Sequence, residues 1–189
     1  MVDTNQLIEI RWHGRGGQGV VTSTELVAQA AISEDKYAQA FPSFGPERRG
    51  APVTAFVRID NIKPIRIRSE IREPDIMVIL DPTLLKIASV VSGLKENGIL
   101  VINTTAQIEQ LRKELNHNFS LAVLDATKIA REILGVPIAN TTMIGALMRA
   151  KGMVQLSSFV EPLKNRFGRL ADKNIKAMKK AYEETALTG

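Results

Sequence analysis

The residues best placed to do chemistry form a glycine-rich loop near the start of the chain. Gly14, Gly16, Gly17 and Gly19 follow a short apolar run at residues 7–12, and apolar positions at helical spacing come after them. Glycine takes positive φ without steric cost and lets another group approach the main chain closely. A strand, a glycine loop and a helix N-terminus in this order direct backbone N–H groups and the helix dipole towards an anion. The stretch therefore predicts an anion-binding loop.

The same spacing, Gly14-x-Gly16-x-x-Gly19, also satisfies the dinucleotide-binding fingerprint. That fingerprint requires an acidic residue at the end of the second strand, about 20 residues further on, to hold the ribose hydroxyls. Here Glu34 and Asp35 precede the second expected strand instead of closing it. An NAD(P)-binding dehydrogenase is therefore the weaker alternative.

A second group of reactive side chains lies in residues 42–52, where three prolines and two glycines exclude a helix or a central strand. This loop carries Glu47, Arg48 and Arg49. Arginine forks make bidentate, charge-assisted bonds to phosphate oxygens. The same arginine pair is equally suited to salt bridges with a partner chain, so the sequence leaves both roles open.

The remaining residues form no catalytic constellation. The chain has no cysteine and two histidines, so we expect no disulfide, no zinc thiolate site and no iron–sulfur ligand in it. His13 adjoins the glycine loop, and we expect it to orient that loop through a backbone hydrogen bond. The sequence therefore predicts no catalytic residue and no metal site, and a binding domain that needs other chains to do chemistry.

Strand and helix patterns alternate along the chain. Apolar runs typical of strands occupy residues 7–12, 37–41, 75–80, 99–102 and 121–124. Helical patterns occupy residues 84–91, 107–115, 127–134, 140–151 and 170–185. We expect Thr22 or Ser23 to cap the first helix. The turn signal Asp60-Asn61 predicts an antiparallel hairpin of residues 53–59 and 62–71.

These elements predict an α/β fold: a Rossmann-like, mostly parallel sheet with flanking helices, an antiparallel hairpin and C-terminal helices. We expect a single domain over residues 1–189, with a helical part from about residue 141 to 189. Asp81, Asn103 and Asp125 end three of the expected strands, so they and the glycine loop should share the carboxyl edge of the sheet. Asp125 is also explained as a helix N-cap and Asp81 by turn chemistry.

Composition and charge exclude several other classes. The net charge is +5, and the chain is 44% hydrophobic and 24% charged, which is ordinary for a globular protein. No apolar run reaches the length of a membrane span and the N-terminus has no apolar targeting segment, so we expect a cytoplasmic protein without membrane contact. Basic residues are not interleaved with aromatic ones, which disfavours nucleic acid as a partner.

Two motifs carry a family resemblance. HGRGGQGVVTSTELVAQAA at residues 13–31 and KYAQAFPSFGPERRGAPVTAFVRI at residues 36–59 resemble the gamma subunit of the 2-oxoacid:ferredoxin oxidoreductases, above all the pyruvate synthase and 2-oxoisovalerate types. The pieces EPDIMVILDPTLL and LDATKIAREILGVPIANTTMIGA extend the resemblance across nearly the whole chain.

The resemblance implies a subunit of an enzyme that converts a 2-oxoacid and coenzyme A to acyl-CoA and carbon dioxide, with two electrons passing to ferredoxin. In that family thiamine diphosphate sits on the alpha and beta subunits and [4Fe-4S] clusters on the beta and delta subunits. The implied partners are these alpha, beta and delta subunits, and ferredoxin through the complex. Pyruvate is the expected substrate, and a 2-oxoisovalerate- or 2-oxoglutarate-type enzyme is the alternative.

The resemblance also implies a ligand for the two loops, because the gamma chain is associated with the coenzyme A side of the active site. Coenzyme A carries a pyrophosphate, which suits a glycine nest at a helix N-terminus, and a further 3′-phosphate, which suits arginine forks. The residues expected to contribute to coenzyme A binding are Gly14, Gly16, Gly17, Gln18, Gly19, Arg48 and Arg49.

Overall fold

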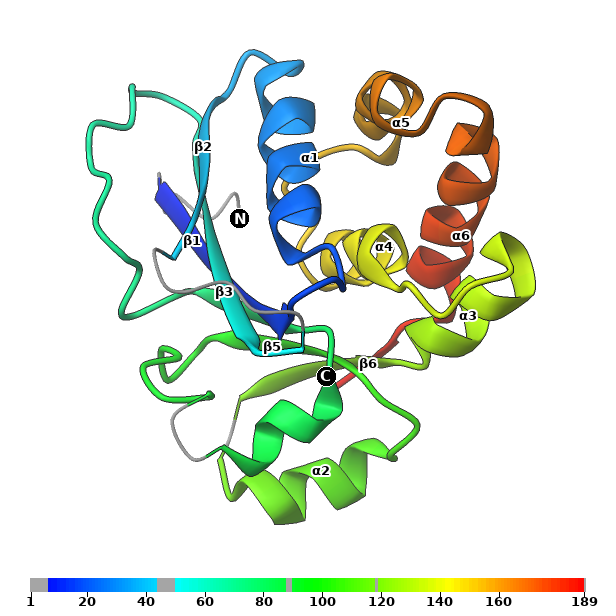
Figure 1. Cartoon of the computed structure of the whole chain (residues 1–189). Coiled ribbons are helices and arrows are strands. Elements are labelled where there is room, and N and C mark those ends of the chain that lie inside the picture. The colour runs from blue at the N-terminus through cyan, green and yellow to red at the C-terminus, as the bar shows by residue number, and fades with distance from the viewer. Residues whose placement is uncertain (1–6, 44–49, 88–89, 118, 189) are drawn as a thin grey trace.

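The computed structural model describes residues 7–43, 50–87, 90–117 and 119–188. In these residues the strands form one seven-stranded sheet with the order β2-β3-β1-β4-β5-β6-β7 (Figure 1). The strands are β1 Leu7–Arg15, β2 Tyr37–Pro42, β3 Pro52–Asp60, β4 Ile76–Ile79, β5 Ile99–Asn103, β6 Ser120–Leu124 and β7 Ala186–Leu187. The central four, β1, β4, β5 and β6, pair in parallel, whereas β3 pairs antiparallel with both β1 and β2, and β7 antiparallel with β6.

Helices cover both faces of the sheet. The α-helices are α1 Val20–Ile32, α2 Ile108–Leu115, α3 Ala126–Leu134, α4 Asn140–Ala150, α5 Val160–Phe167 and α6 Ala171–Glu184. Short 3₁₀ turns are η1 Pro82–Lys86, η2 Leu156–Phe159 and η3 Gly168–Leu170. Buried side chains of α1, α3, α4, α5 and α6 belong to one apolar cluster, and those of η1 and α2 to a second. None of the helices in the described ranges is long and apolar enough to cross a bilayer.

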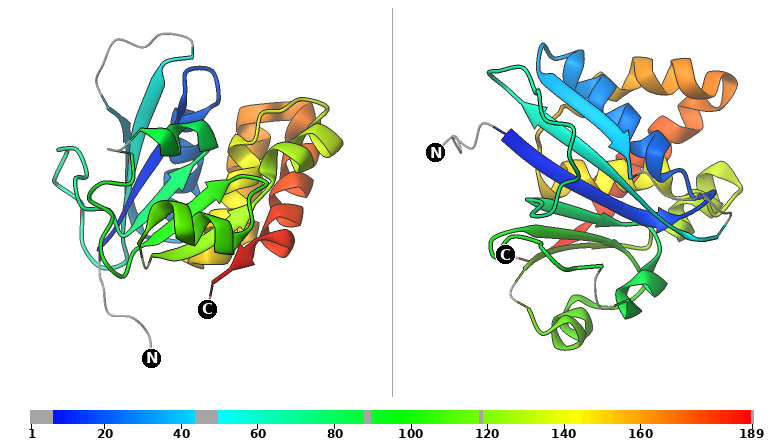
Figure 2. Two further views of the ribbon diagram at one scale, coloured as in Figure 1. Left: turned by 90° about the horizontal axis from the view of Figure 1, so that it is seen from below. Right: turned by 60° about the vertical axis from the view of Figure 1, so that its left-hand side comes forward.

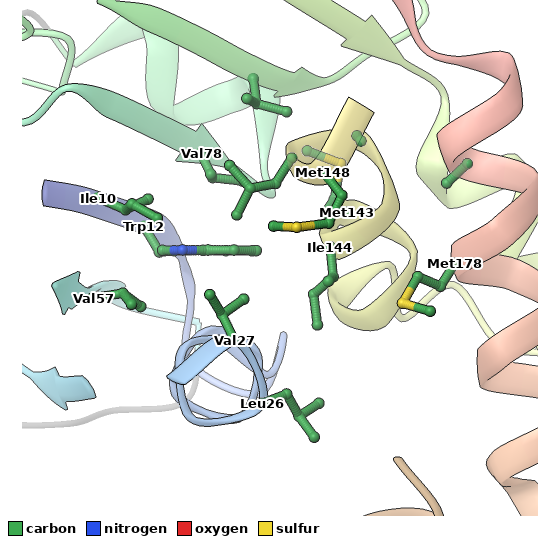
Figure 3. Close-up of a cluster of buried hydrophobic side chains, with 14 of the residues drawn as sticks. Ile10, Trp12, Leu26, Val27, Val57, Val78, Met143, Ile144, Met148 and Met178 are labelled. Carbon is green, nitrogen blue, oxygen red and sulfur yellow. The ribbon is translucent and has the colours of Figure 1, made fainter. Parts of the chain in front are cut away.

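The two apolar clusters follow from the period of two along a strand. In β4, Ile76 and Val78 contribute to the cluster under α1 and α4, and Met77 and Ile79 to the cluster under α2. Trp12 of β1 is fully buried and lies between Val27 of α1 and side chains of α4 (Figure 3). Strands buried on both faces are typical of a sheet with helices on either side, and the predicted α/β class is confirmed.

The first helix begins earlier than its sequence suggests. Its N-cap is Gly19, in the left-handed region with φ 79°, and α1 starts at Val20. The Ser23 N–H already donates to the Gly19 carbonyl at 3.0 Å, and the Ser23 hydroxyl donates to the same oxygen at 3.1 Å. The prediction that Thr22 or Ser23 caps the helix is therefore wrong, because both residues lie inside its first turns.

The predicted hairpin is also wrong. β3 has neighbours on both sides, β1 and β2, so no strand formed by residues 62–71 could pair with it. Asp60 ends the strand instead, since its Oδ1 accepts hydrogen bonds from the N–H groups of Ile62 and Lys63 at 2.8 and 3.0 Å. We call residues 61–75, which are neither helix nor strand, the β3–β4 segment.

Residues 88–89 of the helix expected at residues 84–91 lie outside the described residues. In the described part the helix is reduced to the 3₁₀ turn η1, because Ile87 has an extended backbone and caps the turn by donating to the Leu84 carbonyl. The other predicted helices agree with the structure to within a few residues. Those at residues 107–115, 127–134 and 140–151 correspond to α2, α3 and α4. The short strand β7, which extends the sheet beyond β6, has no counterpart among the sequence-based expectations.

Candidate functional site

The polar ends of the parallel strands share one edge of the sheet. β1 ends at Arg15, β4 is followed by Asp81, β5 ends at Asn103 and β6 is followed by Asp125. Because β1, β4, β5 and β6 run in the same direction, these residues lie at their carboxyl ends, next to the loop of residues 16–19 that leads into α1. The predicted gathering of polar residues at this edge is confirmed.

The glycine loop is fixed against the start of β3. The Gly16 N–H donates to the Ala51 carbonyl at 2.9 Å, and the Gly50 N–H donates to the Gly16 carbonyl at 3.2 Å. Within the loop the Gln18 N–H donates to the Arg15 carbonyl at 3.0 Å. Gly50 therefore brings the end of the proline-rich loop to the glycine loop. The arginine pair that precedes it in sequence, Arg48 and Arg49, lies outside the described residues.

Gly17 and Gly19 present N–H groups at the start of α1. Both have positive φ, 95° and 79°, which favours glycine. Among the described residues neither N–H has an acceptor, and no side chain caps the helix. The first N–H groups of a helix have no partner within it, so they and the two loop groups form a cluster of donors at the positive end of the helix dipole.

The glycines differ in what surrounds them. A Cβ on Gly14 would lie 2.5 Å from Val20 Cγ2, and one on Gly19 would lie 2.4 Å from Nδ2 of Asn140, the first residue of α4. A Cβ on Gly17 would meet nothing within 4 Å. Gly14 and Gly19 therefore allow close packing inside the protein, whereas Gly17 faces open space.

Arg15 is the part of this site that sequence reasoning missed. Its Nε lies 3.0 Å from Asp81 Oδ2, its Nη1 donates to the Gly50 carbonyl at 3.1 Å, and its Nη2 donates to the Thr83 hydroxyl at 2.8 Å. One guanidinium thus joins the end of β1 to the loops before β3 and after β4. The only signal in the sequence is its place between two glycines of the fingerprint.

Gln18 completes this network from inside the glycine loop. Its Oε1 accepts from the Arg15 N–H at 2.7 Å and its Nε2 donates to Asp81 Oδ2 at 3.1 Å. Burial raises the pKa of the Asp81 carboxyl, but hydrogen bonds from Thr83 and Gln18 and the charge of Arg15 outweigh it, and the pKa is lowered overall. Asp81 is therefore an ionised anchor that holds the loop in place.

His13 does not orient the loop through the backbone. Its Nδ1 lies 3.3 Å from the Thr54 hydroxyl on β3, and its buried Nε2 has no partner among the described residues. Burial, with a smaller contribution from the charge of Arg11, lowers the pKa of His13 to about 4. The predicted backbone hydrogen bond is wrong, and the imidazole is neutral at pH 7.

The other strand-end residues have structural partners. Asp125 Oδ1 accepts from the Lys128 N–H at 2.9 Å, which confirms that it caps α3. Asp81 Oδ1 accepts from the Thr83 N–H at 3.0 Å, as its expected turn requires. Asn103 donates to the Leu80 carbonyl at 2.8 Å and accepts from the Thr127 N–H at 3.2 Å.

A hollow at the same edge is lined by residues that follow β4, β5 and β6, together with the cations of α3. They are Pro82, Asn103, Thr104, Thr105, Asp125, Thr127, Lys128, Arg131 and Glu132. A further hollow lies at the opposite edge and is lined in part by Ile8, Asp75 and Lys95. There Lys95 Nζ pairs with Asp75 Oδ1 at 2.6 Å, whereas Lys128 and Arg131 at the carboxyl edge have no ion pair with the described residues. Within the described ranges no three histidine, aspartate or glutamate side chains gather as a metal site would require.

The sheet order also argues against a dinucleotide-binding βαβ unit. In that unit the strand after the glycine helix lies beside the first strand. Here β2 follows α1, but β3 lies between β1 and β2 and pairs antiparallel with both. The ribose-binding position of the fingerprint therefore has no equivalent beside β1.

Comparisons with known proteins agree on one family. The model of the family "Pyruvate ferredoxin/flavodoxin oxidoreductase" matches residues 9–184. The chain is 53% identical over 181 residues to the "Pyruvate/ketoisovalerate oxidoreductases common subunit gamma" of Pyrococcus furiosus, covering 95% of this chain and 97% of that protein. It is 47% identical over 184 residues to the "Pyruvate synthase subunit PorC" of Methanothermobacter marburgensis, covering 97% and 100%.

A solved structure gives the same result at the level of the fold. The pyruvate oxidoreductase subunit PORC of Thermotoga maritima is 39% identical and superposes with a TM-score of 0.87, covering 98% of this chain and 100% of that one. The match therefore includes the glycine loop, the mixed sheet and the C-terminal helices. This chain belongs to the pyruvate ferredoxin/flavodoxin oxidoreductase family, in which it aligns with gamma subunits over nearly its whole length.

Proposed function

We propose that this chain is the gamma subunit of a multi-subunit pyruvate:ferredoxin oxidoreductase. The reaction consumes pyruvate and coenzyme A, forms acetyl-CoA and carbon dioxide, releases the thiol proton and passes two electrons to ferredoxin, and it is reversible. Full-length similarity to gamma subunits of pyruvate-converting enzymes supports this proposal. A 2-oxoisovalerate-type enzyme is the second candidate, because the Pyrococcus furiosus relative is named as a subunit common to pyruvate and ketoisovalerate oxidoreductases.

Partner subunits supply the thiamine diphosphate and the [4Fe-4S] clusters in this proposal. The chain has no cysteine, the side chain that holds such clusters, and Arg15, Gln18 and Asn103 at the carboxyl edge already bond to groups of this chain. Its own contribution is to pack against the alpha, beta and delta subunits and to help bind coenzyme A.

The observation that carries the coenzyme A role is the donor cluster at the glycine loop. The N–H groups of Gly17 and Gly19 lack acceptors among the described residues, and α1 starts without a side-chain cap. Such a cluster fits the pyrophosphate of coenzyme A, because each phosphate oxygen accepts from several N–H groups at the positive end of a helix. Gly17, with open space around it, allows a phosphate to approach the main chain.

Nearby cations add to the positive field. Arg166 of α5 donates to the hydroxyl of Thr22, in the first turn of α1, at 3.2 Å. A cation beside a helix N-terminus faces the positive end of the dipole, and a bound anion offsets that repulsion. Exposed Lys128 and Arg131 line the hollow at the same edge. The contribution of Arg48 and Arg49 to the 3′-phosphate stays a prediction.

A matched pair of substitutions at Gly17 tests this role in the assembled enzyme. Gly17→Asp and Gly17→Asn have nearly the same shape and both tolerate the left-handed region, but only the first places a negative charge at the donor cluster. We expect Gly17→Asp to raise the KM for coenzyme A about tenfold over that of Gly17→Asn, since two like charges a few ångströms apart at a surface repel by about 1–3 kcal/mol. The KM for pyruvate should be equal in the two complexes.

The complexes must first be compared for subunit content, so that a change in assembly is separated from a change in binding. Intact complexes with equal KM values for coenzyme A would show that the loop does not bind its phosphates. High salt should reduce the difference between the two variants, because screening weakens the repulsion.

A further inference from the structure

The β3–β4 segment exposes both apolar and cationic side chains. Ile62 is 69% exposed and Ile67 54% exposed, although isoleucine is usually buried. The cations Lys63, Arg66, Arg68 and Arg72 are also exposed, and none has an ion pair with the described residues. This mixture of apolar and arginine side chains is typical of a protein-binding surface.

The N–H groups of residues 65–73 also lack partners among the described residues. Every residue from 65 to 73 carries an N–H group, and no described residue accepts a hydrogen bond from any of them. Backbone groups in folded proteins are nearly always paired, with the protein or with water. A run of unpaired donors on an ordered chain is available to the carbonyl groups of another extended chain.

The segment is held in place from beneath, by its carbonyl groups. Arg58 of β3, which pairs with Glu9 at 2.8 Å, donates to the Ile67 carbonyl at 3.2 Å. Arg11 of β1 donates to the carbonyls of Ile71 and Arg72 at 3.4 and 3.3 Å. The buried Arg58 and the partly buried Arg11 thus hold three carbonyl groups of the segment against the sheet. A surface that is already ordered loses less conformational entropy on binding.

The segment runs beside β2 and β3 over their length. It leaves Asp60, which lies opposite Tyr37 at the start of β2, and reaches Ser43 beyond the end of β2, where the Ser43 hydroxyl donates to Glu70 Oε1 at 2.6 Å. It then returns to Asp75, whose N–H donates to the Glu9 carbonyl at 2.8 Å. In Figure 2 it projects on the side of the sheet away from α4, α5 and α6. It is therefore separate from the C-terminal helices.

We propose that the β3–β4 segment is a docking surface for an extended, acidic stretch of a partner subunit. Carbonyl groups of that stretch accept from alternate N–H groups within residues 65–73, its carboxylates face Arg66 and Arg68, and its apolar side chains cover Ile62 and Ile67. The charge of residues 61–68 selects this occupant, because they carry three cations and no carboxylate, and residues 61–68 of a second copy of the chain would bring the same cations together. The proposal rests on the proposed membership of a multi-subunit enzyme.

Hydrogen–deuterium exchange tests the proposal directly. The amides of residues 65–73 should exchange rapidly in the chain purified alone, and about half of them, in alternation, should exchange at least tenfold more slowly in the isolated complex. The amides of the central strand β4 are protected in both states and give the internal reference. If residues 65–73 exchange equally fast in the complex and in the chain alone, the docking proposal is overturned. This holds even if the complex contains the larger subunits and oxidises pyruvate.

Charge reversal gives an independent readout. We expect a tagged chain with Arg66→Glu and Arg68→Glu to recover at least fivefold less of the larger subunits than the wild-type chain. The matched control, Lys176→Glu with Lys179→Glu on the exposed face of α6, changes the net charge equally and should recover the wild-type amount. If both variants recover the wild-type amount of the larger subunits, or both lose them equally, the β3–β4 segment is not the docking surface. Failure of the wild-type chain to recover any larger subunit contradicts the proposed function itself.

Discussion

Replacing Gly19 by alanine tests whether the glycine loop is built by close packing as well as by backbone conformation. Gly19 has φ 79°, and a Cβ there would lie 2.4 Å from Asn140 Nδ2 and 3.0 Å from its Cγ. The left-handed region costs a residue with a Cβ about 1–2 kcal/mol, and forcing extra atoms into a packed site costs about 1–3 kcal/mol more. We therefore expect Gly19→Ala to lower the free energy of unfolding by about 3 kcal/mol.

Gly17→Ala is the matched control, because Gly17 also has a positive φ, 95°, but a Cβ added there would meet no atom within 4 Å. It carries the conformational cost alone, about 1–2 kcal/mol. For a domain of this size 1 kcal/mol corresponds to about 2–4 °C in Tm. Thermal unfolding followed by circular dichroism should therefore show a decrease of about 9 °C for Gly19→Ala and about 4 °C for Gly17→Ala.

A double-mutant cycle separates the two contributions. Asn140→Ala removes the amide that the new Cβ would meet, so in its presence Gly19→Ala should cost at least about 1 kcal/mol less than in the wild-type background. Equal Tm decreases for the two glycine variants, or an additive cycle, would refute the reasoning that contact with the start of α4 fixes this end of the loop.

Two further predictions concern the core and the buried histidine. Gly145→Ala should lower the free energy of unfolding by about 3 kcal/mol in denaturant titrations, because a Cβ there would lie 2.0 Å from the Met178 carbonyl oxygen between α4 and α6. Gly152→Ala is its control, because a Cβ there would lie 3.8 Å from the Met148 carbonyl oxygen. The change in stability should stay within about 1 kcal/mol, and equal effects of the two substitutions would contradict the packing argument. The pKa of His13 is about 4 in the folded state and about 6.5 in the unfolded state. The unfolded state therefore binds the proton first, and the free energy of unfolding falls as the pH drops from 6.5 towards 4. We expect a loss of about 2 kcal/mol between pH 8 and pH 5 that is missing in His13→Gln, and a variant with the wild-type pH dependence would show that another group is responsible.

The sequence predicts the central part of the fold well because local patterns determine it. Strands β4, β5 and β6 are continuous apolar runs followed by helix signals, and a parallel sheet with its polar strand ends at one edge follows from that alternation. The glycine loop was predictable for the same reason, since glycines at these spacings lie between a strand and a helix.

The errors arise where distant residues decide the structure. The alternating pattern of residues 62–68 is typical of a strand, yet β1 and β2 already occupy both edges of β3. The role of Arg15 depends on Asp81, 66 residues away in sequence, and the close approach at Gly19 depends on Asn140. Long-range contacts of this kind leave no local pattern, so the network that supports the loop emerges only from the folded chain.

The most direct test of the central claim is recovery of this chain, with a tag, from its native cells in the absence of oxygen. We predict that larger subunits containing thiamine diphosphate and iron are recovered with it, and that the eluate reduces a viologen dye only when pyruvate and coenzyme A are both present. If the eluate prefers a different 2-oxoacid, only the proposed substrate is wrong. A chain that is recovered without partners, shows no such activity and binds NADH would contradict the account.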